Sequence, residues 1–151
     1  PTFSGRTFKH ILVPLWLLRW RVKATPAAEA YRHFDADAGR WVSQSWHEID
    51  AEFELWRRAL AAEEFSPGER IAILMPNGIP HIAMDQAALS RGLVPVPMHA
   101  VDNPDSIAYI LADSGALLLL VLSVSAAAAL SVVRAVRRVT PRVRRSFVIM
   151  P

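Results

Sequence analysis

The stretch from Arg70 to Gly115 decides the fold: RIAILMPNGIPHIAMDQAALSRGLVPVPMHAVDNPDSIAYILADSG. Ile71 to Met75 is a short apolar run typical of a buried strand, and Pro76-Asn77-Gly78 ends it with residues that favour turns. A helix is expected to begin near Pro80, because proline is well tolerated in the first helical turn. Ile82, Leu89 and the alanines between them should form its mostly apolar face. Arg91-Gly92 should end that helix, since glycine adopts the left-handed C-cap geometry at little cost.

The second half of the stretch repeats the pattern. Leu93 to Val96 predicts another short strand, and Asn103-Pro104 can cap and open a further helix. That helix should present Ile107, Ile110 and Leu111 on one face and end at Gly115. Strands without a polar face, alternating with helices, predict an α/β fold: a partial parallel sheet with helices on both faces.

A β-hairpin is expected before this sheet, from two short strands at residues 30–34 and 40–43. Ser45 and Glu48 then have the spacing of a capping box at the start of a helix over residues 46–64. The apolar stripe of this helix follows from spacings of four, three and four: Ile49, Phe53, Trp56 and Leu60.

Residues 116–133 contain no charged residue and are followed by six arginines, which is formally the pattern of a membrane span. The alternative is a buried strand at Leu117 to Leu122 and an alanine-rich helix from about Ser125. We favour the second interpretation, because serines cluster at the joint. After Pro141, a last strand is predicted from Ser146 to Met150.

Residues 1–24 form an apolar and aromatic lead segment with basic residues at both ends. The run from Ile11 to Leu18 is much shorter than the roughly 20 residues that span a bilayer. Packing as a helix on the sheet, or on a part of the protein outside this chain, is the favoured interpretation, and a helix lying on a membrane surface is the alternative.

Composition and charge exclude several kinds of site and partner. The chain has 151 residues, a mean hydropathy of +0.22 and no cysteine, so it has no disulfide framework and no thiolate metal site. All 14 acidic residues and 11 of the 17 basic residues lie before Arg134, so residues 134–151 carry a charge of +6. Since no aromatic side chains are interleaved with these arginines, nucleic acid is not expected as a partner.

No residue of the chain is predicted to be catalytic, to bind a cofactor or to bind a metal. His10, His33, His47, His81 and His99 lack the spacing of metal ligands. Asp102 and Asp105 flank a helix start, where acids complement the helix dipole. Met75-Pro76-Asn77-Gly78 lies where parallel sheets bind ligands, but it has one glycine and is explained by a tight turn.

Several phrases of the sequence, in order and spacing, resemble the AMP-forming acyl-CoA synthetases of the adenylate-forming ligase superfamily. They are Ser45-Trp46-His47-Glu48-Ile49, Pro67-Gly68-Glu69-Arg70-Ile71-Ala72-Ile73-Leu74, Pro76-Asn77-Gly78, Asp85-Gln86-Ala87-Ala88, Gly92-Leu93-Val94-Pro95-Val96-Pro97 and Tyr109-Ile110-Leu111-Ala112-Asp113-Ser114-Gly115-Ala116. The resemblance covers roughly residues 20 to 150. It is strongest to long-chain fatty-acid:CoA ligases.

The resemblance implies that residues 1–151 are the incomplete N-terminal part of an AMP-binding domain. The full-length enzyme would use fatty acid, ATP, Mg and coenzyme A in the cytoplasm, with peripheral contact to the inner face of a membrane left open. The family's phosphate loop, acidic motifs and catalytic lysine lie downstream, so this chain alone is expected to be inactive and to pack against the remainder of the enzyme. The alternatives are another adenylate-forming branch, or a small membrane-associated or interaction protein.

Overall fold

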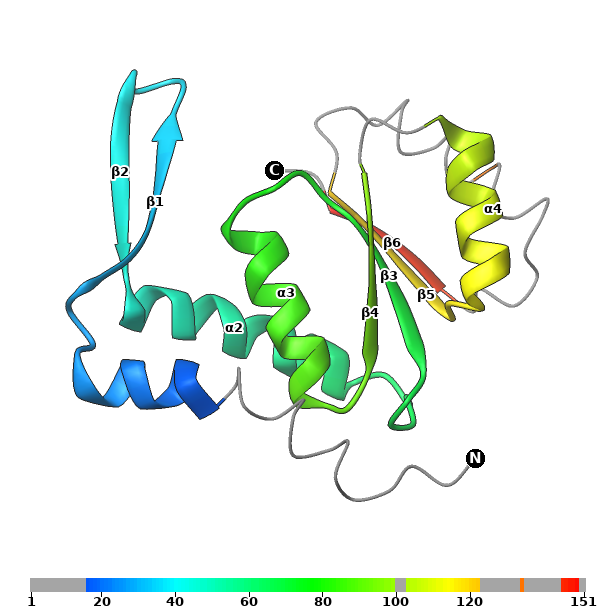
Figure 1. The fold of residues 1–151 in the computed structure, drawn as a ribbon, viewed down its shortest axis with the longest axis horizontal. Helices are drawn as coiled ribbons and strands as arrows, with labels where there is room; N and C mark the ends of the chain where they lie inside the picture. Colours follow the sequence, from blue (N-terminus) through cyan, green and yellow to red (C-terminus); the bar gives the residue numbers. More distant parts are fainter. Residues whose placement is uncertain (1–15, 100–102, 123–133, 135–144, 150–151) are drawn as a thin grey trace. The chain divides into compact units, whose positions relative to one another are not determined.

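The computed structural model describes residues 16–99, 103–122, 134 and 145–149 of the chain (Figure 1). The chain divides into two compact units. Unit 1 comprises Pro1–Glu64 and Gly78–Gly92, and unit 2 comprises Phe65–Asn77 and Leu93–Pro151. Unit 1 therefore contains the hairpin with its helices, and unit 2 contains the parallel sheet.

Unit 2 is built on a four-stranded sheet in the order β4-β3-β5-β6, in which all neighbouring strands are parallel (Figure 1). The strands are β3 (Arg70–Leu74), β4 (Val94–Met98), β5 (Leu118–Leu122) and β6 (Arg145–Ile149). The parallel α/β arrangement predicted from the apolar runs is confirmed. The strand β5 also confirms the choice of a buried strand at the start of the uncharged stretch.

Helix α4 (Pro104–Ser114) covers one face of this sheet. Its buried residues Ile107 and Leu111 belong to a core cluster to which the sheet contributes Ala72, Leu74, Leu119 and Val121. Residues two apart on one strand point to the same face, so each strand supplies alternate side chains to this core.

Both ends of α4 are fixed by the residues that predicted them. The Asn103 side chain accepts a hydrogen bond from the Ser106 amide at 2.9 Å. Gly115 has a φ of 66°, the left-handed conformation that favours glycine. The start and the end of the helix are therefore encoded locally.

Strand β4 is at one edge of the described sheet and extends to Met98, past the predicted end at Val96, although it contains Pro95 and Pro97. The Val94 amide donates to the Glu69 carbonyl beside β3 at 2.9 Å. Because donor directions alternate along a strand, positions 95 and 97 face away from β3, so proline removes no bond to that strand. The prolines thereby leave the outer edge of β4 without two of its donors.

We expect the double substitution Pro95→Val and Pro97→Val to increase self-association of the chain. It restores two outward N–H groups on an edge strand, which is a template for pairing with another chain. Light scattering across a concentration series would measure the effect, with Val94→Thr on the same strand as the control. Equal molar mass for the double variant and the wild type at every concentration would contradict this role of the prolines.

The described part of unit 1 starts with helical residues 16–24, which are followed by the antiparallel hairpin of β1 (Glu29–Asp35) and β2 (Arg40–Ser45). Helix α2 (Trp46–Ala61) starts directly after β2, and α3 (Ile79–Ser90) packs against α2 (Figure 1). The predicted hairpin is confirmed.

The predicted capping box of α2 is also confirmed. The Glu48 amide donates to the Ser45 hydroxyl at 3.3 Å, and the Ser45 amide donates to the Glu48 carboxylate at 2.7 Å. Hydrogen bonds from the backbone and side chain of Ser45 lower the pKa of Glu48. The carboxylate therefore stays charged at the positive end of the helix dipole, where it stabilises the first turn.

The buried faces of α2 and α3 differ in part from expectation. Ile49, Phe53 and Leu60 are buried as predicted, whereas Trp56 is only half-buried and donates its Nε1 hydrogen to Glu52 at 3.0 Å. On α3 the alanines between Ile82 and Leu89 are buried as predicted, together with Met84, whereas Ile82 and Leu89 themselves are only half-buried. Small side chains allow two helices to approach closely, which explains why the larger Ile82 and Leu89 lie at the margin.

Several predictions concern residues outside the described ranges: the first 15 residues, Asp102, the helix from about Ser125, the break at Pro141 and the strand end at Met150. In the described residues, no helix has the length and apolar character needed to cross a bilayer.

Candidate functional site

The carboxyl ends of β3, β4 and β5 lie side by side in unit 2. Leu74 on β3 is in register with Met98 on β4 and with Val121 on β5. Ligands of open parallel sheets bind at this edge of the strands. The residues that follow β3 and β4 there include Asn77 and His99, both exposed.

These residues do not form a catalytic arrangement by themselves. Asn77 supplies an amide and His99 an imidazole at this edge. Asp105 lies in the first turn of α4 and is exposed, in keeping with its predicted helix-start position. Among the described residues no group of three or more His, Cys, Asp or Glu is placed to hold a metal ion.

The histidines are dispersed, and His10 lies outside the described ranges. His33, His47 and His99 are exposed, and His81 on α3 is half-buried with no hydrogen-bond partner for its Nδ1 atom. Burial raises the pKa of Asp85, one helical turn after His81, while the charge of His81 and a hydrogen bond from Gln86 oppose that rise. Burying a neutral carboxylic acid costs less than burying a carboxylate, so the raised pKa follows from the half-buried position of Asp85.

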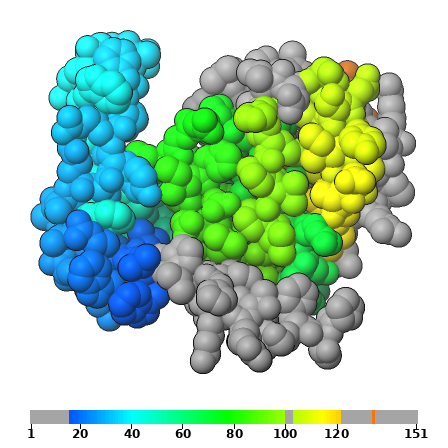
Figure 2. All heavy atoms as spheres, viewed as in Figure 1, coloured from blue at the N-terminus to red at the C-terminus, as the bar shows by residue number. Residues whose placement is uncertain are grey.

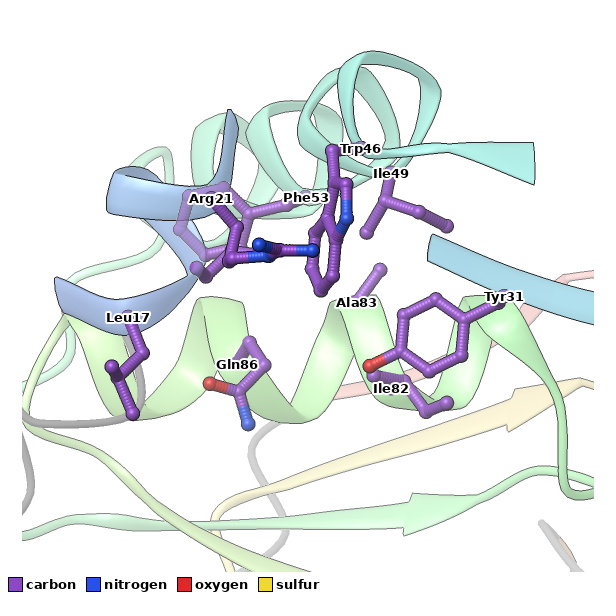
Figure 3. A pocket seen from close by; sticks show the side chains of 10 residues that line it. Leu17, Arg21, Tyr31, Trp46, Ile49, Phe53, Ile82, Ala83 and Gln86 are labelled. Atoms are coloured by element: carbon purple, nitrogen blue, oxygen red, sulfur yellow. The ribbon is translucent and has the colours of Figure 1, made fainter. Parts of the chain in front are cut away.

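Unit 1 contains a cavity of about 230 Å³ (Figure 3). Its apolar wall is made by Leu17, Leu18, Ile49, Phe53, Ile82 and Ala83. Its polar groups belong to Arg21, Tyr31, Trp46 and Gln86. These residues come from four elements, the helix over 16–24, β1, α2 and α3, so no local sequence pattern could have predicted the cavity.

Three of the polar residues of the cavity, Arg21, Tyr31 and Trp46, make aromatic contacts. The Arg21 guanidinium lies 5.4 Å from the centre of the Trp46 ring and 5.8 Å from that of Trp20. The Tyr31 and Trp46 ring centres are 6.2 Å apart and tilted by 56°. In Figure 3 the Trp46 indole extends from α2 between Arg21 and Tyr31. These contacts fix the orientation of the arginine side chain at the cavity.

Comparison with known proteins assigns the chain to a family. The family model described as AMP-binding enzyme matches residues 18–149. The long-chain-fatty-acid–CoA ligase FadD13 of Mycobacterium tuberculosis is 29% identical over 100 residues, which is 66% of this chain and 19% of that protein. The chain thus spans about a fifth of the length of this curated relative.

Solved structures agree with this match. A fatty acyl CoA synthetase of Mycobacterium tuberculosis superposes with a TM-score of 0.73 at 25% identity, covering 89% of this chain and 26% of the other. The inhibitor-bound N-terminal domain of FACL13 from the same organism gives a TM-score of 0.75 at 25% identity, covering 89% of this chain and 32% of that domain. With its parallel sheet, its hairpin and a match over most of its length, the chain belongs to the AMP-binding enzyme family.

Proposed function

We propose that the chain is the N-terminal part of the AMP-binding domain of a cytoplasmic long-chain fatty-acid:CoA ligase. The family match over residues 18–149 carries this proposal, and the identity to a long-chain-fatty-acid–CoA ligase supports the substrate class. The whole enzyme would join the acid to ATP, releasing pyrophosphate, and coenzyme A thiol would then displace AMP to give the acyl-CoA.

We infer that the groups that such chemistry requires come from residues outside this chain. The sequence contains no glycine-rich phosphate loop. The described residues hold no acidic cluster for Mg. We therefore assign ATP, Mg and coenzyme A to parts of the enzyme beyond these residues. Unit 2 would contribute strands to the sheet behind the active site, and the chain alone would be inactive.

The substrate class is tested by measuring acyl-CoA formation by the full natural polypeptide that carries this sequence. We expect turnover with ATP, Mg, coenzyme A and palmitate, and a clearly lower kcat/KM with benzoate or an amino acid. Preference for benzoate or for an amino acid would move the protein to another branch of the adenylate-forming ligases.

We also propose a peripheral membrane contact through the helix over residues 16–24. Trp16 and Trp20 lie one turn apart and are 65% and 50% exposed, beside the basic Arg19 and Lys23. Figure 2 shows this segment, in blue, at the surface of unit 1. Exposed tryptophan and basic residues on one short helix are typical of segments that lie on anionic membranes.

Vesicle binding tests this contact. We expect the chain to sediment with phosphatidylserine vesicles, and the double substitution Trp16→Ala and Trp20→Ala to reduce the bound fraction several-fold, because the buried aromatic area is lost. Trp41→Ala is the matched control, since Trp41 is 63% exposed on the hairpin of the same unit. Unchanged sedimentation of the double variant would contradict the proposal.

A further inference from the structure

The cavity of unit 1 combines an apolar wall with hydrogen-bond donors and lacks an acidic group. Of its lining residues, all within the described part of the chain, none is Asp or Glu, and Arg21 carries the positive charge. Tyr31 and Gln86 add a hydroxyl and an amide. In Figure 3 the Tyr31 hydroxyl is directed from the β1 side toward the middle of the lining residues. This composition favours a ligand with a negative charge and an apolar body.

The donors of Arg21 are available to such a ligand. Three other arginines of unit 1, Arg19, Arg32 and Arg57, form ion pairs with glutamates. Among the described residues Arg21 has no such carboxylate partner, and its guanidinium lies against the Trp20 and Trp46 rings. Stacking uses the flat face of a guanidinium, whereas its N–H donors project from the edge in the plane. The N–H donors of Arg21 can therefore form a bidentate pair with a carboxylate.

The indole of Trp46 lines the cavity and lies against the Arg21 guanidinium. Its Nε1 atom is buried and has no hydrogen-bond acceptor in the described chain. Buried polar groups are normally paired, and a buried donor without an acceptor costs stability. Because this atom is not exposed to the cavity, Trp46 contributes the face of its ring to the site and not its hydrogen-bond donor.

The volume limits the size of the ligand. An apolar protein cavity of about 150 Å³ holds a benzene molecule. The cavity of about 230 Å³ has room for a somewhat larger group, such as a short alkyl chain. From these observations we propose that this cavity binds a small carboxylic acid with an apolar tail of medium length, its carboxylate on Arg21. The site uses residues of unit 1 alone and does not depend on the proposed ligase activity.

Octanoate is the probe, and the purified 151-residue chain is titrated by isothermal calorimetry. The uncharged 1-octanol tests the contribution of the carboxylate, and inorganic phosphate tests the contribution of the tail. We expect octanoate to bind at one site per chain and both other compounds to bind about tenfold more weakly or worse, since a hydrogen-bonded charge pair contributes about that factor. Equal affinity for octanol, equal affinity for phosphate, or no octanoate binding would overturn the proposal.

Variants identify the site. Arg21→Gln should weaken octanoate binding about tenfold or more, and Arg58→Gln, at an exposed position on α2, should leave it unchanged. Arg21→Lys keeps the charge but loses the planar guanidinium, so it should bind octanoate with intermediate affinity. If Arg21→Gln does not fold, the affinity of Arg21→Lys tests whether Arg21 binds the carboxylate. Quenching of Trp46 fluorescence by octanoate, absent in Trp46→Phe, locates the ligand. Wild-type affinity in both Arg21 variants would overturn the assignment.

Discussion

Replacing Phe53 by alanine should lower the free energy of unfolding by about 3–5 kcal/mol. Phe53 has no exposed surface and lies in the buried stripe of α2. The Arg19 guanidinium lies 5.8 Å from the centre of its ring. The substitution removes the aromatic ring and enlarges a cavity that already exists beside it. The surrounding helices are held by other buried residues, so they would not close the space.

Urea denaturation followed by circular dichroism measures this loss. Leu55→Ala is the matched control, because Leu55 lies on the same helix but is 62% exposed, and surface substitutions usually change stability by less than about 0.5 kcal/mol. Equal effects of the two substitutions would show that Phe53 is not part of a packed core.

Leu111→Ala should have the second largest effect, a loss of about 2–5 kcal/mol. Leu111 has no exposed surface and fixes α4 to the sheet of unit 2 together with Ile107. Because the loss falls in unit 2, hydrogen exchange should become faster in β3 and β5 while α2 is less affected.

Tyr109→Ala on the same helix is the control, since Tyr109 is 68% exposed. Hydrogen exchange resolved by residue distinguishes the two units. Unchanged protection of β3 and β5 in Leu111→Ala would mean that α4 does not stabilise the sheet.

Local signals made the helix boundaries predictable. Ser45 with Glu48, Asn103 before Pro104, and Gly115 each satisfy backbone groups or supply a special conformation at a helix end. Such signals act over three or four residues, so they can be read directly from the sequence.

Features that depend on distant residues were not predictable in the same way. The extension of β4 through its prolines depends on which side of the strand faces β3. The partial exposure of Trp56 on α2, and of Ile82 and Leu89 on α3, depends on how closely the two helices approach. These outcomes follow from packing between segments. The periodicity of apolar residues along one segment gives no information about that packing.

The same difference between local and distant signals applies to the strand-to-helix junction and to the cavity. The strand-to-helix junction after Met75 was found from its turn residues and its place after an apolar run. The cavity of unit 1 joins Arg21 and Tyr31 to Trp46 and Gln86, which are widely separated along the chain. Only the folded unit brings these groups together.

ATP–pyrophosphate exchange with palmitate tests most directly the proposal that this chain is part of the scaffold of a ligase and that the catalytic groups lie outside it. The full natural polypeptide and residues 1–151 alone are compared at equal molar concentration, with ATP and Mg present. We predict exchange by the full polypeptide and none above background by residues 1–151. Exchange by residues 1–151 alone, or none by the full polypeptide with any carboxylic acid, would contradict the account.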